Sequence, residues 1–168
     1  VPGATIIAYR ADLFTPKEES WSMFWDDRLR GKAVLLDEME EVFAMGLLRE
    51  GYSLNSQKPQ EFQAALAGLS DAVSKNAIEF GGVYENAERL VSGEIWALQC
   101  YNGDAAALKD GLWEIEGPVE NIEYFIPQEG ARLWVDSLAI PRESNSKEIA
   151  HQFINFLMSP EIAAENSH

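Results

Sequence analysis

Hydrophobic residues along this chain fall into strand-sized runs separated by helix-sized amphipathic stretches. Continuous apolar runs occupy residues 4–10, 33–37 and 95–101, which are lengths typical of buried strands. Between these runs the apolar residues recur every three or four positions, as on one face of a helix. This spacing predicts helices at 38–50, 59–73 and 83–94, and another that opens at 102 and is capped by Asn102 or Asp104.

The remaining patterns are shorter, and most of them also predict regular elements. Short strands are predicted at 77–80, 113–116 and 122–127, the longest strand at 131–141, a short helix around Trp21–Trp25, and a final helix at 144–159 with Ser146 as its cap and Pro160 just past its end. Strands that alternate with helices of this length predict an α/β fold with a largely parallel central sheet flanked by helices.

Charge narrows the classes of partner more than any other global property. The 13 basic and 28 acidic residues give a formal net charge of −15, which repels phosphate backbones and anionic lipids and attracts cations. Nucleic acid is therefore not expected as a partner, although acidity can also serve solubility alone. Two His and one Cys argue against a zinc site, and Cys100 lies in an apolar strand where a thiol packs as a small hydrophobe. We expect neither a metal nor a cofactor.

Acidic and aromatic residues stand where an α/β sheet usually binds ligands, at the carboxyl ends of its strands. Glu38 follows the strand at 33–37, and Tyr101 and Asp104 follow the strand at 95–101. Trp134 and Asp136 are two residues apart in a predicted strand, so their side chains share one side of it. Carboxylates beside aromatic rings suit an organic cation, because an ammonium group is attracted to both.

Other interpretations of the same residues remain open at this point. Glu38 and Asp136 could form the carboxylate pair of a glycoside hydrolase. Acids near the start of a helix also stabilise the helix dipole without any further function, as Glu38 and Glu41 would at 38–50. An acidic face could instead bind a basic protein. The chain has no phosphate-binding glycine loop and no convincing Ser–His–Asp arrangement.

Four stretches resemble the extracellular solute-binding proteins of ABC importers, most closely the spermidine/putrescine-binding branch. They are "GKAVLLDEMEEVF", "EIWALQCYNGDAAAL", "LWVDSLAIP" and "KEIAHQFINFLMSPEIA". The resemblance implies a type II periplasmic-binding-protein lobe and a binding protein rather than an enzyme. It also implies that a polyamine such as putrescine or spermidine is captured in the periplasm, or at the extracellular face of the cytoplasmic membrane, and passed to a membrane permease.

The same resemblance implies roles for individual residues. Trp134 takes the place of the ring that stacks on the polyamine, and Asp136 that of the principal amine acceptor. Tyr101 stands where the branch usually has Trp, and Asp104 where relatives often have Ser or another small residue. The ligand-binding residues carried across by position are Glu38, Glu41, Tyr101, Asp104, Trp134 and Asp136.

Relatives in that family are about twice as long, so we interpret residues 1–168 as a single α/β domain equivalent to their second lobe. The strands at 4–10 and 132–140 would be the hinge strands, and the helix within 142–168 would join the first lobe in relatives. We expect a fragment whose signal sequence lies outside this chain, and a homodimer of that fragment is plausible on this interpretation. A sugar, ferric iron or an amino acid derivative is the alternative solute for the same fold.

Overall fold

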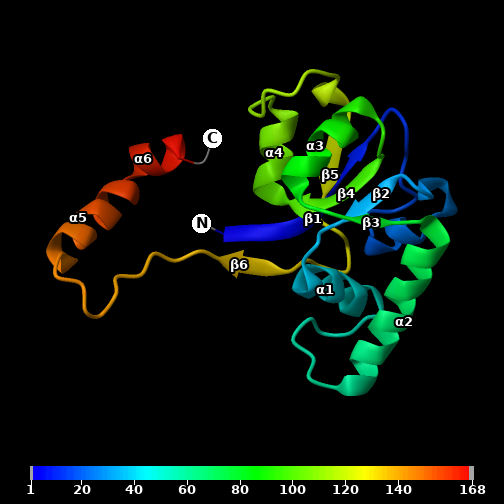
Figure 1. Ribbon diagram of the computed structural model, residues 1–168, viewed down its shortest axis with the longest axis horizontal. Coiled ribbons are helices and arrows are strands. Elements are labelled where there is room, and N and C mark those ends of the chain that lie inside the picture. The colour runs from blue at the N-terminus through cyan, green and yellow to red at the C-terminus, as the bar shows by residue number, and fades with distance from the viewer. Residues whose placement is uncertain (1, 167–168) are drawn as a thin grey trace. The chain divides into compact units, whose positions relative to one another are not determined.

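The computed structural model describes residues 2–166 of the chain, and its strands and α-helices are labelled in Figure 1. The strands are β1 (Pro2–Arg10), β2 (Ala33–Leu35), β3 (Glu79–Phe80), β4 (Ala97–Tyr101), β5 (Ile122–Phe125) and β6 (Leu133–Val135). The α-helices are α1 (Met39–Arg49), α2 (Pro59–Asn76), α3 (Val83–Ser92), α4 (Asn102–Lys109), α5 (Lys147–Leu157) and α6 (Pro160–Glu165). Three short 3-10 helices complete the set: η1 (Trp21–Trp25), η2 (Asp27–Leu29) and η3 (Val119–Asn121).

The strands form one sheet in the order β3-β2-β4-β1-β5, and β6 also pairs with β1. The α/β fold with a central sheet flanked by helices is confirmed, but the sheet is mixed rather than largely parallel. β2 runs parallel to β3 and β4, whereas β1 runs antiparallel to β4 and β5. The helices between β2, β3 and β4 provide the crossovers that parallel neighbours require. The sequence pattern alone does not reveal that the first strand enters between β4 and β5 in the opposite direction.

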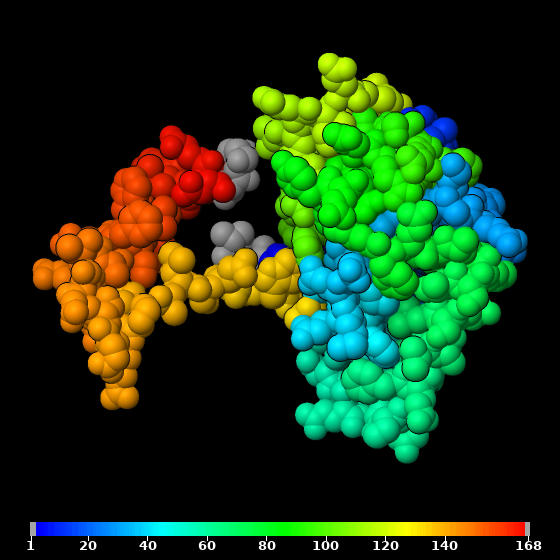
Figure 2. Space-filling view, viewed as in Figure 1, coloured from blue at the N-terminus to red at the C-terminus, as the bar shows by residue number. Residues whose placement is uncertain are grey.

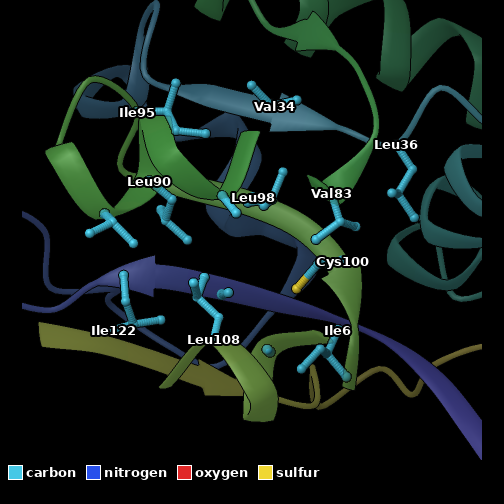
Figure 3. Packing of buried hydrophobic residues seen from close by; sticks show 14 of the residues in the cluster. Ile6, Val34, Leu36, Val83, Leu90, Ile95, Leu98, Cys100, Leu108 and Ile122 are labelled. Carbon is cyan, nitrogen blue, oxygen red and sulfur yellow. The ribbon is translucent and has the colours of Figure 1, made fainter. Parts of the chain in front are cut away.

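Two apolar clusters lie against the sheet and hold the helices to it. Neighbouring residues of β1 belong to different clusters, Ile6 to one and Ile7 to the other, because successive strand residues point to opposite faces. The first cluster, shown in Figure 3, joins the sheet to α3 and α4 through residues such as Leu90 and Leu108. The second joins it to η1, α1 and α2, and includes the buried Trp21. Helices therefore cover both faces of the sheet.

Three predictions for the later part of the chain are wrong in detail. Residues 113–116 form no strand, since they lie between Gly111 and Gly117, whose positive φ angles turn the backbone at each end. The predicted strand at 131–141 is reduced to β6, because pairing with β1 is limited to Leu133–Val135. The longest strand is β1. The helix predicted at 144–159 is α5, with Pro160 past its end as expected, but it is not the final helix, because Pro160 opens the short helix α6.

The chain divides into two compact units. One is Gly3–Trp134, which contains both apolar clusters, and the other comprises the described residues from Val135 onward together with Pro2. The boundary falls within the predicted hinge strand at 132–140. The second unit holds α5 and α6, and neither helix has a buried residue. Among residues 2–166, no helix combines the length and the apolar character needed to cross a membrane.

Candidate functional site

Tyr101 and Glu38 meet at the end of the sheet where the parallel strands β2 and β4 finish. Glu38 precedes α1 directly after the turn that follows β2, and Tyr101 is the last residue of β4. The Tyr101 hydroxyl donates a hydrogen bond of 2.7 Å to Oε1 of Glu38. Burial raises the pKa of Tyr101, and the acceptor Glu38 raises it further, so the phenol keeps its proton and remains a donor.

A hollow of about 270 Å³ opens beside this pair in the unit Gly3–Trp134. Its wall combines carboxylates with aromatic rings, and no basic side chain lines it. The acids are Asp37, Glu38 and Asp104, the rings are Tyr84, Tyr101 and Trp113, and the remaining lining residues are Leu36, Gly82 and Val83. The rings of Tyr84 and Trp113 lie 4.9 Å apart between centroids. This wall suits a cation with an apolar carbon chain.

Asp104 enters the hollow from the first turn of α4, as predicted from its place after β4. Burial raises its pKa, since no described basic side chain faces it to favour the charged form. The prediction that Asn102 or Asp104 caps α4 is wrong. Tyr101 occupies the cap position without a side-chain bond, and Oδ1 of Asn102 instead accepts the backbone N–H of Ala4 at 2.7 Å.

Trp134 lies edge-on to Tyr101, with ring centroids 5.0 Å apart and an interplanar angle of 80°. The ring reaches this place because residue 3 is glycine. A Cβ on Gly3 would come within 2.4 Å of the Trp134 ring, closer than any normal contact. The absence of a side chain on β1 thus lets the indole lie against the strand, with Tyr101 beside it.

Glu41 lies one helical turn after Glu38 but is buried, unlike Glu38, which is exposed. Its carboxylate accepts hydrogen bonds from the Thr5 hydroxyl and from the guanidinium of Arg132. Arg132 also donates to Glu40 at 2.8 Å. The resemblance assigned Glu41 to the ligand, and the structure shows that its carboxylate already has two partners within the protein.

Buried Gln99 ties the start of α1 to the sheet. Its side-chain oxygen accepts the backbone N–H of Leu36 at 3.2 Å, and its Nε2 donates to the carbonyl of Glu41 at 3.3 Å. Gln99 therefore sets the path of the chain between β2 and α1, and Glu38 lies in this connection. The segment of α1, light blue in Figure 2, reaches the surface beside α2.

Asp136 belongs to the other unit. Its side chain is exposed, and it borders a hollow of about 700 Å³ together with residues of α5 and α6 such as Leu157 and Ala163. The structure thus brings five of the six predicted residues into one unit, around the end of β4, and places the sixth in the second unit.

Sequence reasoning missed residues whose partners are distant in the chain. Tyr84 has no pattern of its own, because it is an exposed residue in the first turn of a helix. Arg132 lies 91 positions from Glu41, so no local spacing joins them. The available signal in the sequence for Arg132 was its place as a basic residue two positions before Trp134. Within the described part of the chain, no group of three or more His, Cys, Asp or Glu residues could hold a metal ion.

Comparison with known proteins gives consistent matches over the whole chain. A family profile described as bacterial extracellular solute-binding protein matches residues 1–168. The spermidine/putrescine-binding periplasmic protein of Salmonella typhimurium is 34% identical over 165 residues, which are 97% of this chain and 44% of that relative. The putrescine/cadaverine-binding protein of Pseudomonas aeruginosa is 26% identical over 149 residues, 86% of this chain and 41% of that relative.

A solved structure agrees with these sequence relationships. The TpPotD lipoprotein of Treponema pallidum superposes with a TM-score of 0.84 at 29% identity, covering 98% of this chain and 50% of that one. The chain therefore spans about half the length of the proteins it matches.

Proposed function

Because this chain belongs to the family of bacterial extracellular solute-binding proteins, we propose that it captures a polyamine, such as putrescine or spermidine, for uptake by an ABC importer. The relatives named for these ligands support the choice of solute. Their description as periplasmic supports a site of action in the periplasm or at the outer face of the cytoplasmic membrane. The partner would be the membrane permease of that importer, and the role is binding rather than catalysis.

One observation carries the choice of ligand: the hollow beside β4 is lined by three carboxylates and three aromatic rings and by no basic side chain. A carboxylate binds an ammonium group through charge-assisted hydrogen bonds. Aromatic faces attract the same cation and cover the methylene groups between two amines. A neutral sugar would gain from the rings but would leave the charge of the acids uncompensated.

Five of the six predicted residues have a distinct task in this proposal. Glu38 accepts the hydrogen bonds of one ammonium group, and the phenol of Tyr101 holds that carboxylate in place. Asp104 supplies a second negative charge in the hollow. Trp134 buttresses the Tyr101 ring through its edge contact and offers its own face to a ligand. Asp136 is proposed as a further amine acceptor on the strength of the family resemblance.

Isothermal titration of putrescine into the chain and two charge-matched variants tests this function. We expect Glu38→Gln to weaken binding by about tenfold or more, since it removes a charged acceptor of an ammonium group. Glu120→Gln removes the same charge from exposed η3, away from the hollow, and should bind like the parent. 1,4-Butanediol, which keeps the carbon chain and lacks the charges, should give no heat.

Either of two outcomes would contradict the proposal. Equal losses in the two variants would mean that putrescine only screens the net charge of −15. Binding of the diol or of a sugar in preference to putrescine would move the assignment to a neutral solute of the same fold.

A further inference from the structure

Arg132 is a cation of the protein itself, placed among the acids near the proposed ligand site. Its guanidinium pairs with Glu41 and, at 2.8 Å, with Glu40. Residues 37–41 contain four acids, so these two pairs leave Asp37 and Glu38 for other partners. Arg132 thus places one positive charge against two of the four acids of residues 37–41 and offsets part of the negative charge that this segment would otherwise present to a ligand.

The Glu41 carboxylate lies near the Glu38–Tyr101 pair of the proposed site. Thr5, which donates to Glu41, is paired with Tyr101 in the register of β1 and β4. Glu38 is the residue before α1 and Glu41 lies in its first turn, and, after burial, the charges of both raise the pKa of the Tyr101 phenol. Two residues after Arg132, Trp134 contacts the Tyr101 ring. The Arg132–Glu41 pair and the Glu38–Tyr101 pair are therefore neighbours at one end of the sheet.

From this placement we infer that Arg132 determines specificity by occupying a carboxylate that a longer polyamine would otherwise bind. This inference rests on the proposed function and names the ligand class within it. With Glu41 taken, Glu38 and Asp104 are the acids of the hollow that the proposed function assigns to a ligand, one for each ammonium group of a diamine. To bind Glu41, the third ammonium group of a triamine would have to displace the Arg132 guanidinium. That guanidinium already holds two carboxylates at once, and an ammonium group holds two carboxylates less well.

Replacing Arg132 by glutamine tests the inference. The variant leaves the buried Glu41 carboxylate with Thr5 as its remaining hydrogen-bond donor, so an added ammonium group gains a partner. We expect the ratio of spermidine affinity to putrescine affinity to rise about tenfold or more relative to the parent. Arg132→Lys retains a cation beside Glu41 and should keep a ratio close to that of the parent.

A double variant identifies the carboxylate responsible. Arg132→Gln combined with Glu41→Gln removes both charges of the pair, and the gain for spermidine should disappear. An unchanged ratio in Arg132→Gln would overturn the inference, and so would a gain that persists in the double variant. If the parent binds neither amine, the proposed function fails, which is a result distinct from either of these.

The single variant leaves a buried acid without its cation and is expected to lose stability. Thermal unfolding keeps the test decisive in that case. The two amines are compared at concentrations that saturate the parent equally. Under these conditions spermidine should raise the melting temperature of Arg132→Gln more than putrescine does. The double variant should lack this difference. Equal stabilisation of Arg132→Gln by the two amines would contradict the inference.

Discussion

At the scale of single residues, the site separates its acids by environment. Glu38 is exposed and is held by a phenol, Glu41 is buried and paired with a guanidinium, and Asp104 is partly buried in a hollow that no basic side chain lines. Sequence position alone made these three equivalent candidates. Their different surroundings give them different tasks, because a carboxylate that lacks an internal cation is the one that gains most from an added ammonium group.

Asp104 provides a prediction at this scale. Burial raises its pKa, so it takes up a proton at a higher pH than an ordinary aspartate does. Putrescine affinity should therefore decrease as the pH falls, beginning above the usual range of aspartate, and Asp104→Asn should bind more weakly at pH 7 and show a smaller dependence on pH. Titration calorimetry between pH 4 and pH 8 measures both effects.

The same substitution should raise the stability of the fold at pH 7, although it weakens binding at that pH. A carboxyl whose pKa is raised by folding destabilises the folded state where it is ionised, and this penalty disappears as the pH falls below its unfolded pKa. Asp104→Asn should thus melt at a higher temperature than the parent at pH 7, and the difference should vanish at acid pH. Asp71→Asn on the exposed side of α2 is the control. A lower melting temperature for Asp104→Asn at pH 7 would contradict this account.

At the scale of elements, the alternation of strands and helices was predictable and the direction of β1 was not. Strands and helices between 33 and 109 stand close to their predicted positions, because burial of apolar runs and amphipathic faces is encoded locally. The antiparallel placement of β1 depends on pairing with β4 and β5, which lie some 90 or more residues later. The same reasoning applies to the site: Glu38 and Tyr101 could be found from strand ends, whereas Arg132 and Gln99 act through distant partners.

Gln99 gives the prediction at this scale. Its amide joins β4 to the start of α1, so Gln99→Leu leaves the Leu36 N–H and the Glu41 carbonyl without these partners in the interior. We expect a loss of about 1–3 kcal/mol in the free energy of unfolding, measured by urea denaturation. Gln63→Leu, at an exposed position of α2, should change it by less than about 0.5 kcal/mol. Equal effects of the two substitutions on the free energy of unfolding would contradict the structural role proposed for Gln99.

At the scale of the whole molecule, charge and architecture support one interpretation. The net charge of −15 favours cationic solutes, and the unit Gly3–Trp134 carries both apolar clusters and the acidic hollow. The sheet, with helices on both faces, holds Tyr101 at the end of β4 and Asp104 in the first turn of α4, where the proposed ligand site lies. The chain matches about half the length of these relatives.

The central claim is that the hollow beside β4 holds an organic diamine between acids and rings. Nuclear Overhauser effects between the methylene protons of bound putrescine and the aromatic protons of the protein test it most directly. The account predicts contacts to the rings of Tyr84, Tyr101 and Trp113, which line the hollow, and none to Trp21, which is buried in the second cluster. Saturable binding without contacts to any of the three rings would contradict it.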